Sequence, residues 1–502
     1  MNVITARPLG HAIPDSPHAV SVSLPTMHAV RGYEEKDPEI TRHMALGYPR
    51  FMIHPFARQL AEGLGEKAAY RGRKLWLVSS PGMARALAGY LLDYSAATEA
   101  AAFEDQGLHG VMHVDEAQLS QLAKLFLQHI GGFVSSREAE DQLVRRGLRP
   151  AIFSEPTWAG DAGAEVRRVL RRALPGAQDS DLFLTPSGMN AVYGAFSAVS
   201  AVQVARGRNE WVQLGWLYMD TMAILKKFTG EARYHYLGDV FDLEAVEELF
   251  VARAGKIAGL ITEVPTNPLV QTCDVGALSN LCRRHGVSLI LDPSVASAFA
   301  VNVLPYADLV TASLTKYTGS EGDILAGMVA VNPAGPDAAE LRRLVPVALE
   351  PLYARDLNRL AAQIGQTEAV LQEIGAATGK VAEFLQGHPA VQDVYWALQP
   401  NSAENFERLS RFGGTTGGMI SFVLKGDLAR FYDRLALAKG PSFGQKTTLL
   451  CPFMYLAHYD LVTSEAGLAE LARGGLSPDL LRLCVGTEGA GAIIAALAAA
   501  LG

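Results

Sequence analysis

One lysine stands in a setting that favours covalent chemistry. Lys316 follows LVTASLT (309–315), an apolar run that predicts a buried strand, and the hydroxyl residues Ser313 and Thr315 come just before it. A lysine at a strand end is ordinarily solvated. In a cleft, however, removal from water lowers the pKa of the amine, and the free amine can form a Schiff base with an aldehyde.

A carboxylate lies one crossover away. Asp292 ends VSLILD (287–292), a mostly apolar segment, 24 residues before Lys316. Burying a carboxylate is costly unless it is paired. A salt bridge or a helix cap would meet that need, and so would a cationic heterocycle such as a protonated pyridine nitrogen.

Groups that bind phosphate are also present. TPSGM (185–189) joins an apolar segment to the helical stretch NAVYGAFSAV, and N–H groups at a helix N-terminus bind phosphate where glycine allows close approach. Gly188 and Met189 are therefore candidates. Ser313 and Thr315 share one strand face and supply hydroxyls. If the aldehyde belongs to pyridoxal 5'-phosphate (PLP), an amine, an acid and a phosphate cradle are the groups that its site would need.

Two other segments look like phosphate- or dinucleotide-binding motifs but give weaker evidence for a binding site. SSPGM (79–83) has the same appearance as TPSGM but predicts only an ordinary strand–helix turn. GLGEKA (63–68) fits the dinucleotide pattern formally, but it follows a helix and no acid stands about 20 residues further on. A nicotinamide-dependent dehydrogenase therefore lacks its fingerprint.

Three further side chains follow apolar strands. Tyr218 closes EWVQLGWLY and is either a core aromatic or a ring stacked on a planar cofactor. Asn267 lies in EVPTNP and can donate a hydrogen bond to a phenolic oxygen. Arg482 lies in LLRLCVG, an apolar strand, where a guanidinium needs a carboxylate partner. That carboxylate comes either from the protein or from an amino-acid substrate.

The elements that position these residues follow from the pattern after about residue 180. Short apolar segments alternate with helical ones, which indicates an α/β fold with a mostly parallel sheet covered on both faces. In such sheets, ligands bind at the carboxyl ends of the strands. The segments expected to be strands are DLFLTPSG, EWVQLGWLY, ARYHYLGD, IAGLITEVP, VSLILDP and LVTASLT.

The rest of the chain divides around this region. Residues 1–64 predict an N-terminal arm, extended except for a helix at 56–65. Residues 65–344 predict the large domain, with an extra segment at about 65–175 that holds a strand–turn–helix at 75–94 and two helices capped at Asp115 and at Ser135 or Ser136. Residues 345–502 predict a smaller α+β domain.

Composition narrows the function classes. The chain has 502 residues, is 49% hydrophobic and 19% charged, and carries a net charge of −8 with no basic run, which argues against nucleic acid as a partner. We expect no signal peptide, no membrane span and no metal site. Four cysteines without CxxC spacing predict reduced, partly buried thiols in a cytoplasmic protein.

A series of short motifs, in order and spacing, resembles the PLP-dependent enzymes of Cys/Met metabolism, including cystathionine gamma-synthases, cystathionine lyases, homoserine sulfhydrylases and methionine gamma-lyase. Several stretches resemble the longer, fungal-type cystathionine gamma-synthases. The resemblance covers roughly residues 180–502 and the arm near 48. The motifs are YPR (48–50), SGM (187–189), LYMDT (217–221), EVPTNP (263–268), LILD (289–292), SLTKY (313–317), GGMISF (417–422), SFG (442–444) and LRLCVGTE (481–488).

The resemblance implies a fold type I PLP-dependent transferase with a seven-stranded sheet in the large domain. It implies that Lys316, Tyr218 and Asp292 are catalytic, with Lys316 as the Schiff-base lysine, Tyr218 as the stacking ring and Asp292 as the partner of the pyridine nitrogen. It further implies these roles: Asn267 as a contact to O3′, Gly188, Met189, Ser313 and Thr315 at the phosphate, Arg482 on the substrate α-carboxylate, and Ser442 near lysine and substrate. It also implies that Tyr48 and Arg50 reach the phosphate of a neighbouring subunit, in a homodimer or homotetramer with shared active sites.

The function implied is gamma-replacement on an acylated homoserine by a thiol such as cysteine. A β- or γ-lyase or a sulfhydrylase on the same scaffold is the alternative, and a PLP-binding regulator without turnover is less favoured because the lysine, aspartate and arginine are all present. The chain departs from short relatives in two places: 137 residues separate Arg50 from Ser187, and SEGD (320–323) stands where GHSD is usual.

Overall fold

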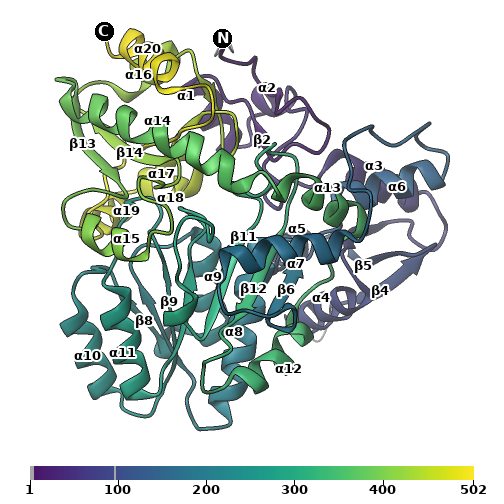
Figure 1. The fold of residues 1–502 in the computed structure, drawn as a ribbon. Coiled ribbons are helices and arrows are strands. Elements are labelled where there is room, and N and C mark those ends of the chain that lie inside the picture. The colour runs from purple at the N-terminus through teal and green to yellow at the C-terminus, as the bar shows by residue number, and fades with distance from the viewer. Residues whose placement is uncertain (1–4, 95–97) are drawn as a thin grey trace.

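A seven-stranded, mostly parallel sheet forms the centre of the molecule. The computed structural model describes residues 5–94 and 98–502 (Figure 1). The strand order is β6-β12-β11-β10-β9-β7-β8, and only β12 runs antiparallel to its neighbours. The expected sheet is confirmed. The strands are β6 (Leu182–Thr185), β7 (Glu210–Leu214), β8 (Tyr234–Leu237), β9 (Ile257–Glu263), β10 (Ser288–Asp292), β11 (Leu309–Ser313) and β12 (Gly327–Val331).

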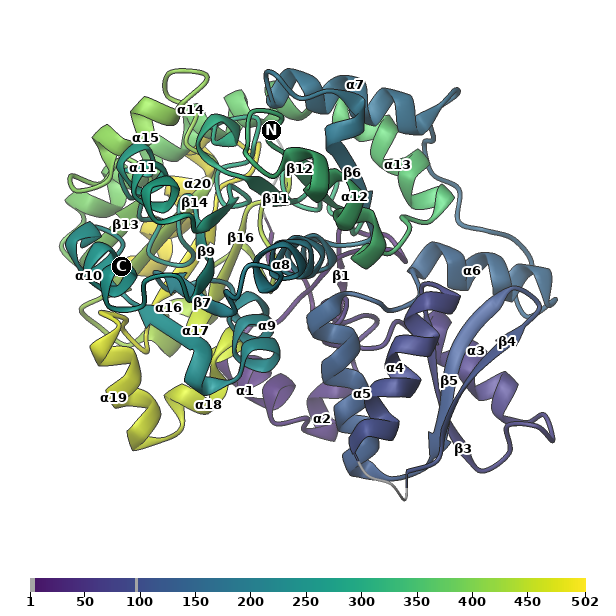
Figure 2. The same ribbon diagram turned by 90° about the horizontal axis from the view of Figure 1, so that it is seen from below.

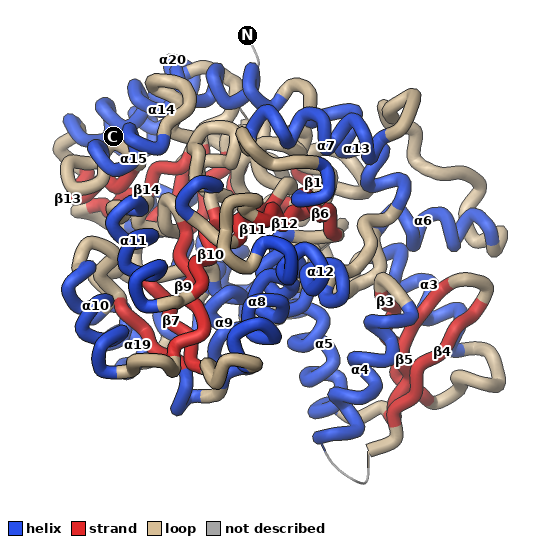
Figure 3. The backbone as a smooth tube through the Cα atoms, turned by 60° about the horizontal axis from the view of Figure 1, so that its bottom comes forward, coloured by secondary structure: helices blue, strands red, loops and turns tan. Residues whose placement is uncertain are grey.

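Helices cover both faces of this sheet because its strands are apolar on both sides (Figure 3). On β9, for example, Ile261 packs with the helices of one face and Leu260 with those of the other. One face carries α8 (Gly188–Val204), α9 (Met219–Thr229) and α12 (Ala338–Ala348), and the other carries α7 (Ala162–Ala173), α10 (Leu243–Ala252), α11 (Val275–His285) and α13 (Ala354–Ile364).

The C-terminal region forms a second sheet with its own core, in the order β13-β14-β17-β16-β15. Residues 354–364, placed by sequence in this smaller domain, form α13, which packs on the core of the large domain. The elements are α14 (Thr367–Gly387), β13 (Val391–Trp396), α15 (Ala403–Leu409), β14 (Met419–Leu424), α16 (Leu428–Arg434), β15 (Ala438–Lys439), β16 (Leu449–Pro452), α17 (Phe453–Ala457), α18 (Tyr459–Val462), α19 (Glu465–Arg473), β17 (Leu481–Cys484) and α20 (Ala490–Leu501).

The N-terminal arm is folded onto the smaller domain of its own chain. β1 (Ala12–Ile13) pairs with β2 (Ser21–Val22), and α1 (Met27–Glu34) buries Met27 and Val30 in the core of the C-terminal domain. Figure 1 shows the purple arm beside the yellow C-terminal helix α20. An extended arm was expected, but α1 carries enough apolar residues to dock. The arm continues through α2 (Pro38–Thr41) to α3 (Pro55–Gly65).

Between the arm and α7 lies a compact extra layer. Its antiparallel sheet, in the order β3-β5-β4, packs α3 and α6 on one face and α4 and α5 on the other (Figure 2). The expected strand–turn–helix and the following helices are confirmed, and Ser135 caps α6; Glu116, not Asp115, precedes α5. We call these elements, with α3, the inserted layer: β3 (Arg73–Val78), α4 (Pro81–Tyr94), β4 (Ala100–Asp105), β5 (Leu108–Val114), α5 (Ala117–Ile130) and α6 (Ser136–Arg145).

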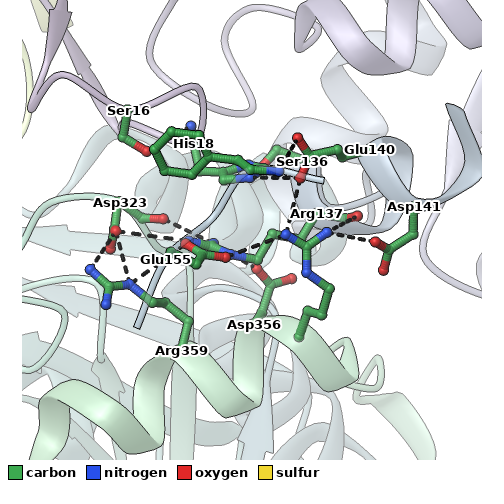
Figure 4. Close-up of polar contacts among 12 residues, drawn as sticks. Ser16, His18, Ser136, Arg137, Glu140, Asp141, Glu155, Asp323, Asp356 and Arg359 are labelled. Carbon is green, nitrogen blue, oxygen red and sulfur yellow. Dashed lines mark hydrogen bonds and ion pairs between the residues drawn. The ribbon is translucent and has the colours of Figure 1, made fainter. Parts of the chain in front are cut away.

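A buried ion network fixes the inserted layer to the large domain (Figure 4). The guanidinium of Arg137, on α6, donates to both carboxylate oxygens of Glu155 (2.7 and 2.6 Å) and to Asp356 on α13 (3.0 Å). It also donates to the backbone oxygen of Asp323 (2.9 Å), while Arg359 binds the Asp323 carboxylate at 2.7 Å. Asp323 belongs to the SEGD segment shortly after Lys316, so the network connects the inserted layer to the lysine loop.

Two further features concern the described residues as a whole. None of their helices is both long and apolar enough to cross a membrane, and none of their His, Cys, Asp and Glu side chains form a group of three or more that could hold a metal ion. The four cysteines are free and buried, as expected for reduced thiols.

Candidate active site

One cavity of about 410 Å³ collects every residue that the sequence predicted for the site. It lies where β9, β10 and β11 end, with the N-terminus of α8 and the smaller domain contributing its other walls. The predicted residues that line it are Tyr48, Arg50, Gly188, Met189, Tyr218, Asn267, Asp292, Ser313, Thr315, Lys316, Ser442 and Arg482.

Lys316 is buried just beyond the end of β11. Its Nζ lies 2.8 Å from the Ser442 hydroxyl and 3.2 Å from the Tyr48 hydroxyl. Gly444, at φ +71°, passes so close that a Cβ there would lie 3.0 Å from the Lys316 Cα. Burial lowers the pKa of Lys316, although the neighbouring Tyr48 raises it in part. The amine is therefore prepared to act as a nucleophile and a base.

Tyr48 accepts a hydrogen bond from this lysine. Burial alone would raise the pKa of the Tyr48 hydroxyl, but the nearby Lys316 and Arg50 cations outweigh burial and lower it. Tyr218 differs, because burial raises its pKa well above the usual value despite the adjacent Arg50. Tyr218 was predicted as a catalytic and stacking residue; of the two phenols, Tyr48 is better suited to accept a proton.

Asp292 faces the cavity from the end of β10. Its carboxylate accepts a hydrogen bond from the Ser294 N–H at 2.8 Å, and burial raises its pKa to about 6. No ion pair to Asp292 forms within the described chain, so the carboxylate has room for an external cation. A protonated pyridine nitrogen matches that need.

Glu263 is a site residue that the sequence reasoning missed, although EVPTNP was singled out. It pairs in register with Asp292, and burial followed by repulsion from Asp292 raises its pKa well above the usual value. Its oxygens accept from the backbone N–H groups of Tyr218 (2.6 Å) and Asn267 (3.1 Å). Glu263 thereby fixes the two segments on either side of the cavity.

The N-terminus of α8 is the place where the sequence predicts the phosphate cradle. Ser187 caps the helix, and a Cβ on Gly188 would lie only 2.7 Å from the Ser313 Cβ, so no larger residue fits without displacement. The Thr315 hydroxyl accepts from the Ala326 N–H at 3.1 Å, which leaves Ser313 as the freer of the two predicted hydroxyl groups.

Arg50 reaches the same end of the cavity within its own chain. It donates to Asp220 (2.7 Å), to the Tyr218 hydroxyl (2.9 Å) and to the backbone oxygen of Gln128 (2.8 Å). Gln128, on α5, also donates to Asp220 at 2.9 Å. The inserted layer thus positions Arg50. Asp220 lies inside the LYMDT motif, whereas no local signal marks Gln128.

Arg482 lines another part of the cavity, beside Asn267 and Ser442. Its guanidinium donates to the Asn267 side-chain oxygen at 3.1 Å and to the Ser442 backbone oxygen at 3.2 Å, and it lies over the Phe453 ring at 4.6 Å. Within the part of the chain described, no carboxylate lies within ion-pair distance of it. Because a buried guanidinium is stabilised by a bidentate carboxylate, this part suits the α-carboxylate of an amino acid.

The comparisons with known proteins agree with this geometry. The family model for Cys/Met metabolism PLP-dependent enzymes matches residues 167–502. The chain belongs to this family. PLP is its cofactor, and the donor set fits: the Lys316 amine for the aldehyde, Asp292 for the ring nitrogen, and the α8 N-terminus for the phosphate.

Relatives of this PLP-dependent enzyme extend over nearly the whole chain. The chain is 37% identical over 476 residues to the L-2-amino-4-chloropent-4-enoate dechlorinase/desaturase of Streptantibioticus cattleyicolor, covering 95% of this chain and 94% of the relative. It is 27% identical to the cystathionine gamma-synthase of Neurospora crassa, covering 97% and 96% of the two chains.

Solved structures share the fold. The cystathionine gamma-lyase of Lactobacillus plantarum, complexed with L-serine, matches with a TM-score of 0.57 at 21% identity, over 70% of this chain and 91% of that one. The cystathionine gamma-synthase of Xanthomonas oryzae, in complex with cystathionine, gives a TM-score of 0.56 at 22% identity, over 70% and 89%. The fold type and the PLP-enzyme class expected from the sequence are thus confirmed, while the individual residue roles remain predictions.

The rejected motifs lie away from this PLP site. SSPGM opens α4 in the inserted layer, and GLGEKA ends α3. Neither segment contributes a residue to the lining of the cavity.

Proposed function

We propose that this PLP-dependent enzyme replaces a leaving group on Cγ of an L-α-amino acid, an acylated homoserine, with a thiol. The observation that carries the proposal is the placement of the Lys316 amine and the unpaired Arg482 guanidinium in one cavity. An amino acid held by Arg482 through its carboxylate presents its amine and Cα toward Lys316. The Cγ–O bond breaks with its electrons leaving on the carboxylate, the sulfur bonds to Cγ, and the thiol proton is released.

Proton movement is the task of Lys316. When bound, PLP supplies the electron sink for this chemistry. Lys316 Nζ takes the proton from Cα and then moves a proton at Cβ, which its lowered pKa permits at neutral pH. Asp292 keeps the ring nitrogen protonated by providing the counter-charge.

Ser442 and Tyr48 orient the lysine. Their hydroxyls hold Nζ from two sides, at 2.8 and 3.2 Å, so that the amine keeps its direction when it is neutral. Tyr48, with its lowered pKa, is placed to accept a proton from the incoming substrate ammonium.

A second candidate is loss of the γ-substituent without replacement. The 37% identical relative is named for a substrate, L-2-amino-4-chloropent-4-enoate, whose chlorine sits on C4, which is Cγ. Both candidates begin with release of a group from the same carbon, and they differ in whether a thiol enters.

Product analysis separates the two. The PLP-loaded enzyme is incubated with O-acetyl-, O-succinyl- and O-phosphohomoserine and with L-2-amino-4-chloropent-4-enoate, each with cysteine, with sulfide or with no thiol, and products are identified by mass. A thioether formed from a homoserine ester and cysteine, or homocysteine formed from the ester and sulfide, supports replacement. Release without a sulfur-containing amino-acid product under every condition supports the second candidate, and no release from any substrate contradicts both.

A further inference from the structure

The active-site cavity extends past Lys316 to a rim that lies outside the matched family region. Tyr33 and Glu34 come from the end of α1 in the arm, and Lys124 comes from α5 in the inserted layer. All three precede residue 167, where the family model begins to match. We call these residues the distal rim. The chemistry at Cγ does not itself account for them.

The distal rim carries charges of both signs that lack partners. Glu34 and Lys124 are half-buried, and neither forms an ion pair within 4.0 Å anywhere in the described chain. Each is nonetheless close enough to shift the other's pKa. Burial raises the pKa of Glu34 to about 7 and lowers that of Lys124. A ligand that supplied the missing counter-charges would remove much of this desolvation cost.

A polar atom beside these charges is also without a partner. The Tyr33 hydroxyl is buried and makes no hydrogen bond within the described residues. A buried hydroxyl is normally satisfied, so an unsatisfied one that lines a cavity marks a place for a ligand atom. Lys36, whose ammonium bonds to the Tyr33 backbone oxygen at 2.9 Å, adds positive charge at the outer edge.

We infer that the distal rim binds the zwitterionic end of the incoming thiol, with Glu34 on its ammonium group and Lys124 on its carboxylate. This inference rests on the proposed function and names the class of its second substrate, a thiol that is itself an α-amino acid. A ligand with one charge would leave either Glu34 or Lys124 unpaired. The Tyr33 hydroxyl supplies a further hydrogen bond to the same zwitterionic end of the thiol.

Thiols that differ only in their charges test this inference. The probes are cysteine, cysteamine (ammonium only), 3-mercaptopropionate (carboxylate only) and hydrosulfide (neither), and kcat/KM for the replacement product (a thioether, or homocysteine from hydrosulfide) is compared between variants with the same thiol. We expect Glu34→Gln to lose roughly tenfold with cysteine and cysteamine but little with 3-mercaptopropionate. We expect Lys124→Gln to lose roughly tenfold with cysteine and 3-mercaptopropionate but little with cysteamine.

The matched control is Glu39→Gln, an exposed arm residue paired with Arg42 outside the cavity, which should behave as wild type. The crossed pattern also excludes general misfolding, since a misfolded variant loses activity with every thiol. Equal losses with all thiols, or none, would overturn the inference while leaving the proposed replacement intact. If no thiol yields a replacement product in the wild-type enzyme, both fail.

Discussion

Asp292 and Glu263 lie side by side at the ends of neighbouring strands but serve different purposes. Glu263, whose pKa is raised by burial and by the neighbouring Asp292, uses both of its carboxyl oxygens to hold two backbone N–H groups. Asp292 opens onto the cavity and has no cationic partner within the described chain. The two carboxyl groups thus differ in their hydrogen-bond and charge partners. For Asp292 this predicts a pH-dependent stability, which can be measured without enzyme turnover.

Cofactor-free enzyme should lose stability through Asp292 as pH rises. The pKa of this carboxyl is about 6 when folded and near 3.8 when unfolded, so between these values the folded state binds more protons. From pH 4 to pH 7 the wild type should therefore lose about 2 kcal/mol of unfolding free energy relative to Asp292→Asn. Urea unfolding of both proteins measures this. PLP should reduce the difference, and a constant difference across the range would contradict the assignment.

Gly188 offers a steric prediction at the phosphate end. In Gly188→Ala the new Cβ would lie 2.7 Å from the Ser313 Cβ, which costs roughly 1–3 kcal/mol of PLP affinity, or about 10- to 100-fold in Kd. Gly89→Ala, on α4 with open space around the added methyl, is the matched control and should bind PLP normally. Fluorescence titration with PLP measures both, and equal affinities would show that the cradle is misassigned.

At the scale of elements, the inserted layer depends on α6. Arg137 on this helix meets the carboxylates of Glu155 and Asp356 and the loop after Lys316, all away from solvent. Beside it His18, whose pKa is lowered to about 2 by burial and then by Arg137, stays neutral and contacts Ser136 and Glu140. The arm, the inserted layer and α13 therefore meet at one buried polar cluster (Figure 4).

Removal of the Arg137 charge should be strongly destabilising. Arg137→Met leaves Glu155 and Asp356 without their closest cation, and breaking buried pairs of this kind costs about 3–5 kcal/mol. Denaturant unfolding at neutral pH measures the loss. Arg343→Met, which breaks an exposed pair with Glu340 on α12, should change stability little. Similar unfolding curves for the two variants would contradict a structural role for the network.

The sequence located the site better than it located the surroundings of the site. Lys316, Asp292 and Arg482 stand out because a charge at the end of an apolar strand is unusual locally. Gln128 could not be found in this way, since its role depends on packing α5 against α9, and its partner Asp220 stands 92 residues further along the chain. The docking of α1 was missed for the same reason: its apolar face is short, and its partner is the C-terminal domain.

At the scale of the whole molecule, each chain holds a complete set of site residues. The resemblance predicted that Tyr48 and Arg50 serve a neighbouring subunit, but here both lie in the cavity of their own chain. The inserted layer supports this arrangement, because Gln128 holds Arg50 from behind. We propose that the active sites are not shared between chains, whatever the oligomeric state.

Complementation between two inactive chains tests this proposal. Arg50→Ala and Lys316→Ala are co-expressed with different tags and purified through both. With sites built within one chain, the hybrid has no intact site and should stay inactive at limiting PLP. With shared sites, each doubly tagged dimer would regain one intact site of its two, and recovery of about half of the wild-type activity would contradict the proposal.

The most direct test of the account is the location of the bound cofactor. The PLP-loaded enzyme is treated with borohydride, digested and mapped by mass spectrometry. The phosphopyridoxyl mass should appear on the peptide that contains Lys316 and should vanish in Lys316→Ala. It should persist in Lys227→Ala, which removes another lysine whose pKa burial lowers, to about 8. A wild-type Lys316 peptide that stays unmodified after saturation with PLP, or a label on another lysine, would contradict the central claim.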